Sequence, residues 1–195
     1  KQLKGSIALL TCTVIWGFAF IAQSVGMDLI GPFTFQMVRC LLAVALLVPL
    51  SFLLDIGKCS MKESFEKWKN PKLWKASILC GIALFVASSL QQNGLMYTDA
   101  GKAGFLTAMY IVLTPIVGLF RGNRVPKATV FSVGIAVIGL YLLSCVGVSQ
   151  INKGDLLIMG CALAFAVQIN VVDHFCEGLD GFRMNCIQAL TVSVI

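Results

Sequence analysis

The sequence predicts an all-α polytopic membrane protein, and three observations support this prediction. Six apolar runs of membrane-spanning length are followed by the start of a seventh, at residues 5–27, 29–54, 76–98, 103–120, 128–152, 156–172 and 184–195. Arg39 is the only charged residue within these runs. The 195 residues are 58% hydrophobic and 12% charged, with a mean hydropathy of +0.89. A bilayer core about 30 Å thick needs about 20 apolar residues per helix, and lipid cannot hydrogen-bond the backbone, so each run is expected to be a helix.

Basic residues gather on one side of the predicted spans. That side holds the N-terminus and the loops after the second and fourth runs, with Lys1, Lys4, Lys58, Lys62, Lys67, Lys69, Lys72, Lys75, Arg121, Arg124 and Lys127. The opposite side has only Lys102 and Lys153. Because Lys and Arg are enriched in cytoplasmic loops, we expect a cytoplasmic N-terminus in the inner or plasma membrane. The net charge of +6 thus reflects topology, and we expect no nucleic-acid partner.

The loop after the second run contains a predicted short helix. Ser60 followed by Glu63 fits a capping box, in which each residue satisfies a backbone N–H of the other. Met61, Phe65 and Trp68 then share one helical face. This pattern predicts an amphipathic helix on the cytoplasmic leaflet, with an ordinary solvated loop as the alternative.

A shift of 149 residues places the start of the sixth run on the start of the first. It pairs several residues without a gap, among them Gly5 with Gly154, Cys12 with Cys161, and Trp16 with Phe165. Five spans separate the two copies, and an odd number inverts the second copy across the membrane. We therefore expect a first repeat of five helices at 5–147, and a second repeat beginning at 154–195 with its first helix and part of its next. Inverted repeats are common in secondary transporters.

Polar side chains within the spans are candidates for function, because such groups are costly in lipid. Trp16 is another candidate, because it lies near mid-span, away from the interfaces where Trp is usually found. Those expected to line a substrate cavity are Trp16, Gln23, Gln91, Tyr110 and Gln168. Aromatic rings with a few amides suit an amino acid or a small aromatic metabolite. Interhelical hydrogen bonding is the alternative role for the amides, and apolar packing is the alternative for Phe165.

Two further residues are expected to shape the helices. Arg39 is favoured as a structural arginine that pairs with Asp28 or Asp99 or snorkels to the surface, rather than as a ligand contact. Pro115 removes a backbone hydrogen bond within the fourth run. It is expected to kink that helix, either beside a cavity or for packing alone.

The sequence gives no support for catalysis. Its eight cysteines are scattered without a CxxC pair, and His174 is the only histidine. Nucleotide-binding and hydrolase motifs do not occur. We therefore expect no enzyme activity, no catalytic residue, no metal and no cofactor.

Several stretches together resemble the EamA domain of the drug/metabolite transporter superfamily. In chain order they are Ile15-Trp16-Gly17, Pro32-Phe33-Thr34-Phe35 leading to Arg39, the junction from Gly94 to Gly104, Thr114-Pro115, Gly134 and Gly139 ending in Leu142-Leu143, and Gly154-Asp155-Leu156-Leu157. One departure is Gly122-Asn123-Arg124, where family members often have Gly-Glu-Arg.

The resemblance implies ten helices in two inverted five-helix repeats around a central cavity, of which this chain covers about six and a half helices. It implies a permease that moves small metabolites, amino acids or drugs, with export the expected direction and the lipid bilayer as its surroundings. Alternatives are a small-multidrug-type exporter subunit, a membrane-embedded enzyme and a non-transporting scaffold. The chain is expected to be incomplete, because it lacks an initial Met and ends within an apolar run.

Overall fold

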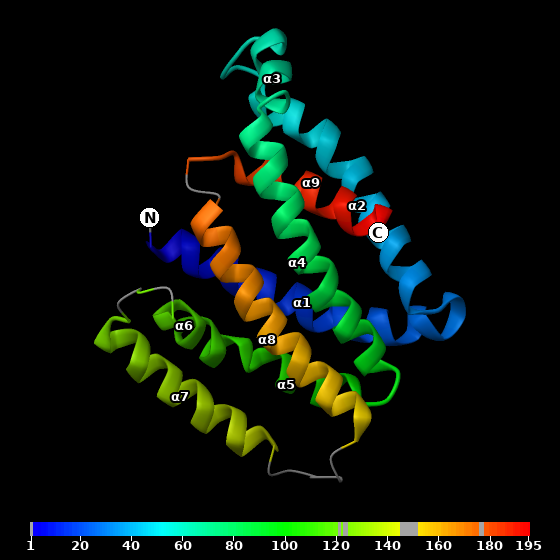
Figure 1. Cartoon of the computed structure of the whole chain (residues 1–195), viewed down its shortest axis with the longest axis vertical. Helices are drawn as coiled ribbons and strands as arrows, with labels where there is room; N and C mark the ends of the chain where they lie inside the picture. Colours follow the sequence, from blue (N-terminus) through cyan, green and yellow to red (C-terminus); the bar gives the residue numbers. More distant parts are fainter. Residues whose placement is uncertain (1, 121, 123–124, 145–151, 176–177) are drawn as a thin grey trace.

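The computed structural model describes residues 2–120, 122, 125–144, 152–175 and 178–195, and all elements within these ranges are helices (Figure 1). They are α1 (Gln2–Ile30), α2 (Pro32–Asp55), α3 (Met61–Trp68), α4 (Pro71–Leu95), α5 (Ala100–Ala108), α6 (Tyr110–Phe120), α7 (Lys127–Ser144), α8 (Lys153–Phe175) and α9 (Gly181–Val194). Five segments of the described chain are long and apolar enough to cross a membrane: Gly5–Met27, Pro32–Asp55, Pro71–Leu95, Ala100–Phe120 and Lys153–Phe175. The all-α polytopic prediction is confirmed. Of the predicted run 128–152, residues 145–151 lie outside the described part of the chain.

Local sequence sets several helix ends. Gly31 adopts φ 76°, and Pro32 follows at the first turn of α2, where a proline needs no N–H partner. The predicted capping box of α3 is confirmed, and the Glu63 carboxylate accepts from the Ser60 N–H at 2.7 Å. Asn70 caps α4 by accepting from the Lys72 N–H at 3.0 Å. With this cap, α4 begins at Pro71, ahead of the predicted start at 76. The prediction missed the first turn because that turn is polar, and the start was placed where the apolar sequence begins.

The predicted fourth run is two helices rather than one. Helix α5 ends at Ala108 and α6 begins at Tyr110, with Met109 between them. The Met109 N–H donates to the Leu106 carbonyl at 3.2 Å, and the Val112 N–H donates to the Met109 carbonyl at 3.0 Å. Such i to i+3 bonds tighten a helix locally. Pro115 lies inside α6, which stays helical on both sides of it.

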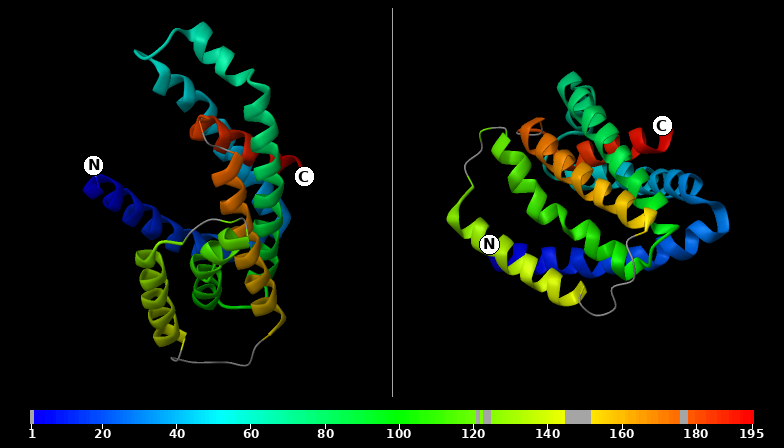
Figure 2. Two further views of the ribbon diagram at one scale, coloured as in Figure 1. Left: turned by 60° about the vertical axis from the view of Figure 1, so that its left-hand side comes forward. Right: turned by 60° about the horizontal axis from the view of Figure 1, so that its bottom comes forward.

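Helices α4 and α8 lie side by side and form the largest interface of the described chain (Figures 1 and 2). Helix α9 packs against both α2 and α4, whereas α5 and α6 pack on α8. Helices α1 and α7 lie at the edge of the structure and make few contacts with other helices. The most apolar 18-residue stretch of α1 contains no buried residue. The core therefore joins segments from both ends of the chain.

Two glycines set how closely α4 and α8 approach. A Cβ added to Gly154 would lie 2.7 Å from the Gly94 carbonyl oxygen and 2.8 Å from the Tyr97 Cβ. A Cβ added to Gly94 would lie 2.6 Å from Cδ1 of Ile158. Small residues at helix crossings let backbones touch, which matters in lipid because there is little hydrophobic force between helices.

We predict that Gly154→Val destabilises the protein by about 1–3 kcal/mol, because the new side chain meets the backbone of α4. Thermal unfolding of the purified protein in detergent measures the effect. Gly17→Ala is the control, since no atom lies within 4 Å of the added Cβ. Equal melting temperatures for the two variants would refute the close crossing.

Candidate functional site

Three aromatic rings from three helices meet beside α8. Trp16 of α1 lies 6.4 Å from Tyr110 of α6 and 6.5 Å from Phe165 of α8, measured between ring centroids. The Tyr110 and Phe165 centroids are 6.2 Å apart. Edge and tilted contacts at these distances are favourable for aromatic pairs. Phe165 is 7% exposed and Trp16 is 45% exposed, so the cluster has one buried end and one open end.

Two of the predicted amides hydrogen-bond to neighbouring helices. The Gln91 Nε2 atom donates to the Thr107 Oγ1 atom at 3.4 Å, which links α4 to α5. The Gln168 Nε2 atom donates to the Gln188 Oε1 atom at 3.2 Å, which links α8 to α9. These contacts are the interhelical bonding that the sequence left open as an alternative. They do not exclude a second role, because an amide has further donor and acceptor capacity.

Two other buried amides have no partner among the described residues. Gln23 is 2% exposed and Gln92 is 1% exposed, and neither the oxygen nor the nitrogen of either amide makes a hydrogen bond there. Burying an unpaired amide costs roughly 1–3 kcal/mol. Such groups are positioned to bind a water molecule, a substrate or another part of the protein. Gln23 was among the predicted residues, whereas Gln92 was not.

The two residues predicted to shape helices make limited contacts. The Arg39 Nη2 atom lies 3.5 Å from the Gln36 Oε1 atom on the same helix. The described side chains, which do not include that of the predicted partner Asp28, form no ion pair with Arg39. Pro115 lines a pocket of about 280 Å³ between α6 and α8 together with Asn170, whose Nδ2 atom donates to the Thr114 carbonyl at 3.0 Å. Pro115 therefore lies beside a pocket, and its role in shaping a substrate cavity stays a prediction.

Two pockets of the described chain contain none of the five predicted cavity residues: the pocket beside Pro115 and the pocket of about 240 Å³ near Gln36 and Val192. The structure brings Trp16 and Tyr110 together, adds Phe165 to them, and leaves Gln91 and Gln168 in separate hydrogen bonds. Their role in substrate binding stays a prediction.

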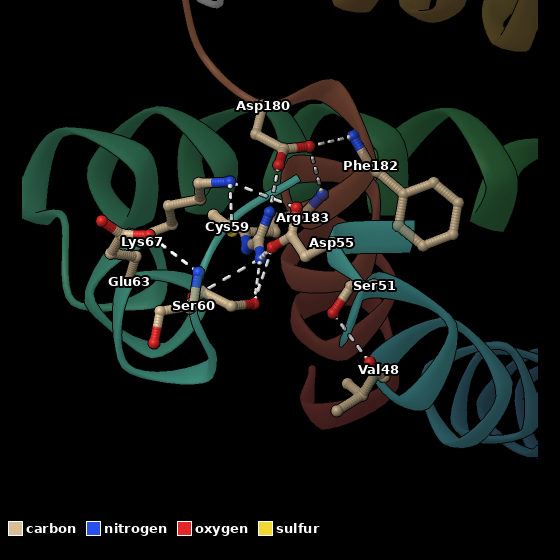
Figure 3. Close-up of polar contacts among 11 residues, drawn as sticks. Val48, Ser51, Asp55, Cys59, Ser60, Glu63, Lys67, Asp180, Phe182 and Arg183 are labelled. Carbon is tan, nitrogen blue, oxygen red and sulfur yellow. Dashed lines mark hydrogen bonds and ion pairs between the residues drawn. The ribbon is translucent and has the colours of Figure 1, made fainter. Parts of the chain in front are cut away.

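A buried guanidinium joins α9 to the connection between α2 and α4 (Figure 3). Arg183 is 1% exposed, and its Nη2 atom lies 2.5 Å from Oδ2 of Asp55 and 2.9 Å from Oγ of Ser64. Its other terminal nitrogen pairs with Asp180, which also caps α9. Lys67 reaches Oδ1 of Asp55 at 3.1 Å, and hydrogen bonds to Asp55 and Cys59 raise the pKa of Lys67.

A second polar cluster lies at the other end of α4 and at the start of α8. Asp155 is 2% exposed, and its carboxylate accepts from Lys102 at 2.6 Å and from Thr98 at 2.7 Å. The Asn152 N–H donates to the same carboxylate at 2.9 Å, and the Asn152 amide donates to the Tyr97 carbonyl at 2.8 Å. This cluster ties α5 and the end of α4 to α8.

Sequence reasoning missed both clusters. The clusters contain charged residues that flank the apolar runs, namely Asp55, Asp155 and Arg183. Charged residues next to the runs were interpreted as parts of loops. A signal was present for Arg183, because Asp180 three residues earlier suits an N-cap, which would have placed Arg183 inside a helix. Nothing in the sequence indicates that Asp55 and Arg183 meet, since 128 positions separate them.

Within the described ranges, no three His, Cys, Asp or Glu residues are grouped so that they could hold a metal ion. Among the described cysteines, Cys80, Cys161 and Cys186 are buried. The chemistry of the described region is therefore that of rings, amides and ion pairs.

We predict that Arg183→Gln lowers the melting temperature by more than about 5 °C, because it leaves Asp55 and Asp180 without their shared cation. Arg183→Lys should lie in between, since one ammonium replaces a forked guanidinium. Lys69→Gln is the control: its pair with Glu66 is exposed, with side chains 61% and 58% accessible, and should change melting by less than about 2 °C. Similar losses for Arg183→Gln and Lys69→Gln would contradict the buried link.

Comparisons with known proteins identify a matching family and two relatives. The model of the EamA-like transporter family matches residues 3–145. An "Uncharacterized transporter" of Archaeoglobus fulgidus is 32% identical over 176 residues, which are 90% of this chain and 51% of that protein. The "Uncharacterized transporter YoaV" of Bacillus subtilis is 24% identical over 177 residues, 89% of this chain and 57% of that protein.

The chain spans about half the length of these two relatives. No solved structure shows significant similarity to it. The family match covers more than half of the residues, and the resemblance seen in the sequence motifs is confirmed: the chain belongs to the EamA-like transporter family, and it is a multi-pass membrane protein.

Proposed function

We propose that the complete gene product is a secondary transporter that exports small metabolites, amino acids or drugs by alternating access. The observation that carries this proposal is the meeting of Trp16, Tyr110 and Phe165 from three helices, with the unpaired amide of Gln23 on α1. Rings supply apolar contact and an unpaired amide supplies hydrogen bonds, which together suit an amphipathic small molecule.

The contact between Trp16 and Phe165 supports an inverted repeat. The shift of 149 residues superposes these two positions, and the structure places their rings 6.5 Å apart in an edge contact. Two residues related by a two-fold axis touch each other only when both lie near that axis. Binding sites of inverted-repeat transporters lie at the repeat interface, near the middle of the membrane.

The two polar clusters also fit alternating access. One joins Asp55 of α2 to Arg183 of α9, and the other joins Lys102 of α5 to Asp155 of α8. Each therefore connects a helix of the proposed first repeat to a helix of the proposed second. On the proposed topology, with the N-terminus cytoplasmic in the inner or plasma membrane, the Asp55 cluster lies on the cytoplasmic side. Contacts that open in turn at the two ends are what alternating access requires.

The first experiment is a substrate screen on the complete gene product. Purified protein is heated with a panel of amino acids, nucleosides and cationic drugs such as ethidium, and a compound that raises the melting temperature is then followed as radiolabelled flux from proteoliposomes. Binding to the folded state stabilises it by mass action. Stabilisation with flux supports a transporter, whereas no stabilisation by any compound favours a non-transporting scaffold.

We predict that Trp16→Ala and Gln168→Ala each lower flux of the identified substrate about tenfold or more, through the loss of a ring contact or a hydrogen bond. Phe18→Ala is the control, because that ring is 69% exposed on the same helix. Expression and melting temperature are measured for each variant. Unchanged flux in well-expressed Trp16→Ala and Gln168→Ala proteins would show that these residues do not line the cavity.

A further inference from the structure

The polar face of α3 is fixed against the rest of the protein. Ser64 is 0% exposed, and its hydroxyl contacts Oδ2 of Asp55 at 2.6 Å and the Arg183 guanidinium at 2.9 Å. Lys67, one turn on, bonds Asp55, and the Trp68 ring lies 5.6 Å from the Arg183 guanidinium carbon. Because these contacts come from α2 and α9, the helix is not free to rotate about its axis (Figure 3).

The face of α3 next to this polar side is apolar, and two of its residues are exposed. Met61 is 70% exposed and Phe65 is 59% exposed. The Phe65 ring stacks on Phe52 of α2, with centroids 6.3 Å apart and an interplanar angle of 28°. Phe52 lies within the last turn of a membrane-spanning segment that ends at Asp55. This contact places Phe65 at the depth where a spanning helix leaves the hydrocarbon.

Lysines surround this apolar face. The exposed ones in and around α3 are Lys58, Lys62, Lys67, Lys69, Lys72 and Lys75, of which Lys67 pairs with Asp55. The Lys69 ammonium lies 5.9 Å from the centroid of the Phe65 ring. Residues 55–75 contain six lysines and three carboxylates, so this segment carries a net charge of +3. Glu63 accepts from the Ser60 N–H and Glu66 pairs with Lys69, which leaves Lys58 and Lys62 without an ion pair among the described residues.

We propose that α3 is a docking surface for anionic phospholipids of the cytoplasmic leaflet. Met61 and Phe65 enter the boundary between headgroups and acyl chains, and Lys58, Lys62 and Lys69 bind the headgroup phosphates. Exposed apolar side chains flanked by lysines are the pattern of interfacial helices, and each lysine near an anionic surface contributes to binding. The proposal does not depend on transport, because α3 contributes no residue to the aromatic cluster, but it rests on the proposed cytoplasmic side for this loop.

The test uses the complete gene product with Phe65→Trp, reconstituted into phosphatidylcholine nanodiscs. A fraction of the lipid is replaced by dibrominated phosphatidylglycerol or, in a matched sample, by the same fraction of dibrominated phosphatidylcholine. Bromine quenches tryptophan on contact, and the parent protein supplies the baseline from its three native tryptophans. Met61→Trp is a second probe, should Phe65→Trp fail to fold.

We expect quenching of the new tryptophan by brominated phosphatidylglycerol to exceed quenching by brominated phosphatidylcholine about twofold. Added salt should reduce this ratio, because headgroup attraction is screened. In a Lys58→Gln, Lys62→Gln, Lys69→Gln background the ratio should return to one while quenching itself persists.

Two results would overturn the proposal. Equal quenching by both lipids in the lysine-containing protein would mean that α3 touches lipid without selecting anionic headgroups. The absence of quenching by either lipid would mean that solvent or another part of the protein covers Met61 and Phe65.

Discussion

Helix α8 crosses α4 so closely that a side chain at Gly94 or Gly154 would collide with the neighbouring helix, and the remaining packing is built around this crossing. Lipid tails are as apolar as leucine side chains, so helices in a bilayer gain little from burying apolar surface against one another. Close backbone contact supplies van der Waals attraction instead. Once α4 and α8 are joined, α9 packs against α4, and α5 and α6 pack against α8.

Two ion-pair clusters then fix the ends of this core. Arg183 gathers α2, α3 and α9, whereas Asp155 gathers α5, α8 and the end of α4. A charge in a low-dielectric region is stable only with a partner, so each cluster constrains which helices lie together. Each cluster links segments of different proposed repeats, so under the proposed alternating-access mechanism the contacts that stabilise the fold would also change as the repeats move.

The middle of the structure differs from its ends. There the polar groups include amides and hydroxyls, and the amides of Gln23 and Gln92 have no partner among the described residues. Together with the Trp16 cluster, they give the region between the two ionic ends apolar contact and spare hydrogen-bonding capacity. Burying these unpaired amides lowers the stability of the fold. In the proposed transporter this cost has a use, because an amide that already had a partner would have to break that hydrogen bond to bind each substrate.

Much of the fold could be predicted from the sequence, because membrane spans depend on properties that are local in the chain. Length and apolarity defined the helices, Ser60 and Glu63 defined the start of α3, and ordered motifs indicated the family. Trp16 and Tyr110 were singled out because aromatic residues deep in a span are unusual. These predictions need no knowledge of which helices are neighbours.

Tertiary structure alone decided the partners. Only folding places Asp55 and Arg183 2.5 Å apart, and only folding shows that Phe165, which packs in the apolar core, also meets Trp16 and Tyr110. The break at Met109 also escaped prediction, because the apolar run continues through it. The physical reason is common to all three. Hydrophobicity records where a residue lies relative to lipid, whereas contacts between helices depend on distances that the linear sequence does not contain.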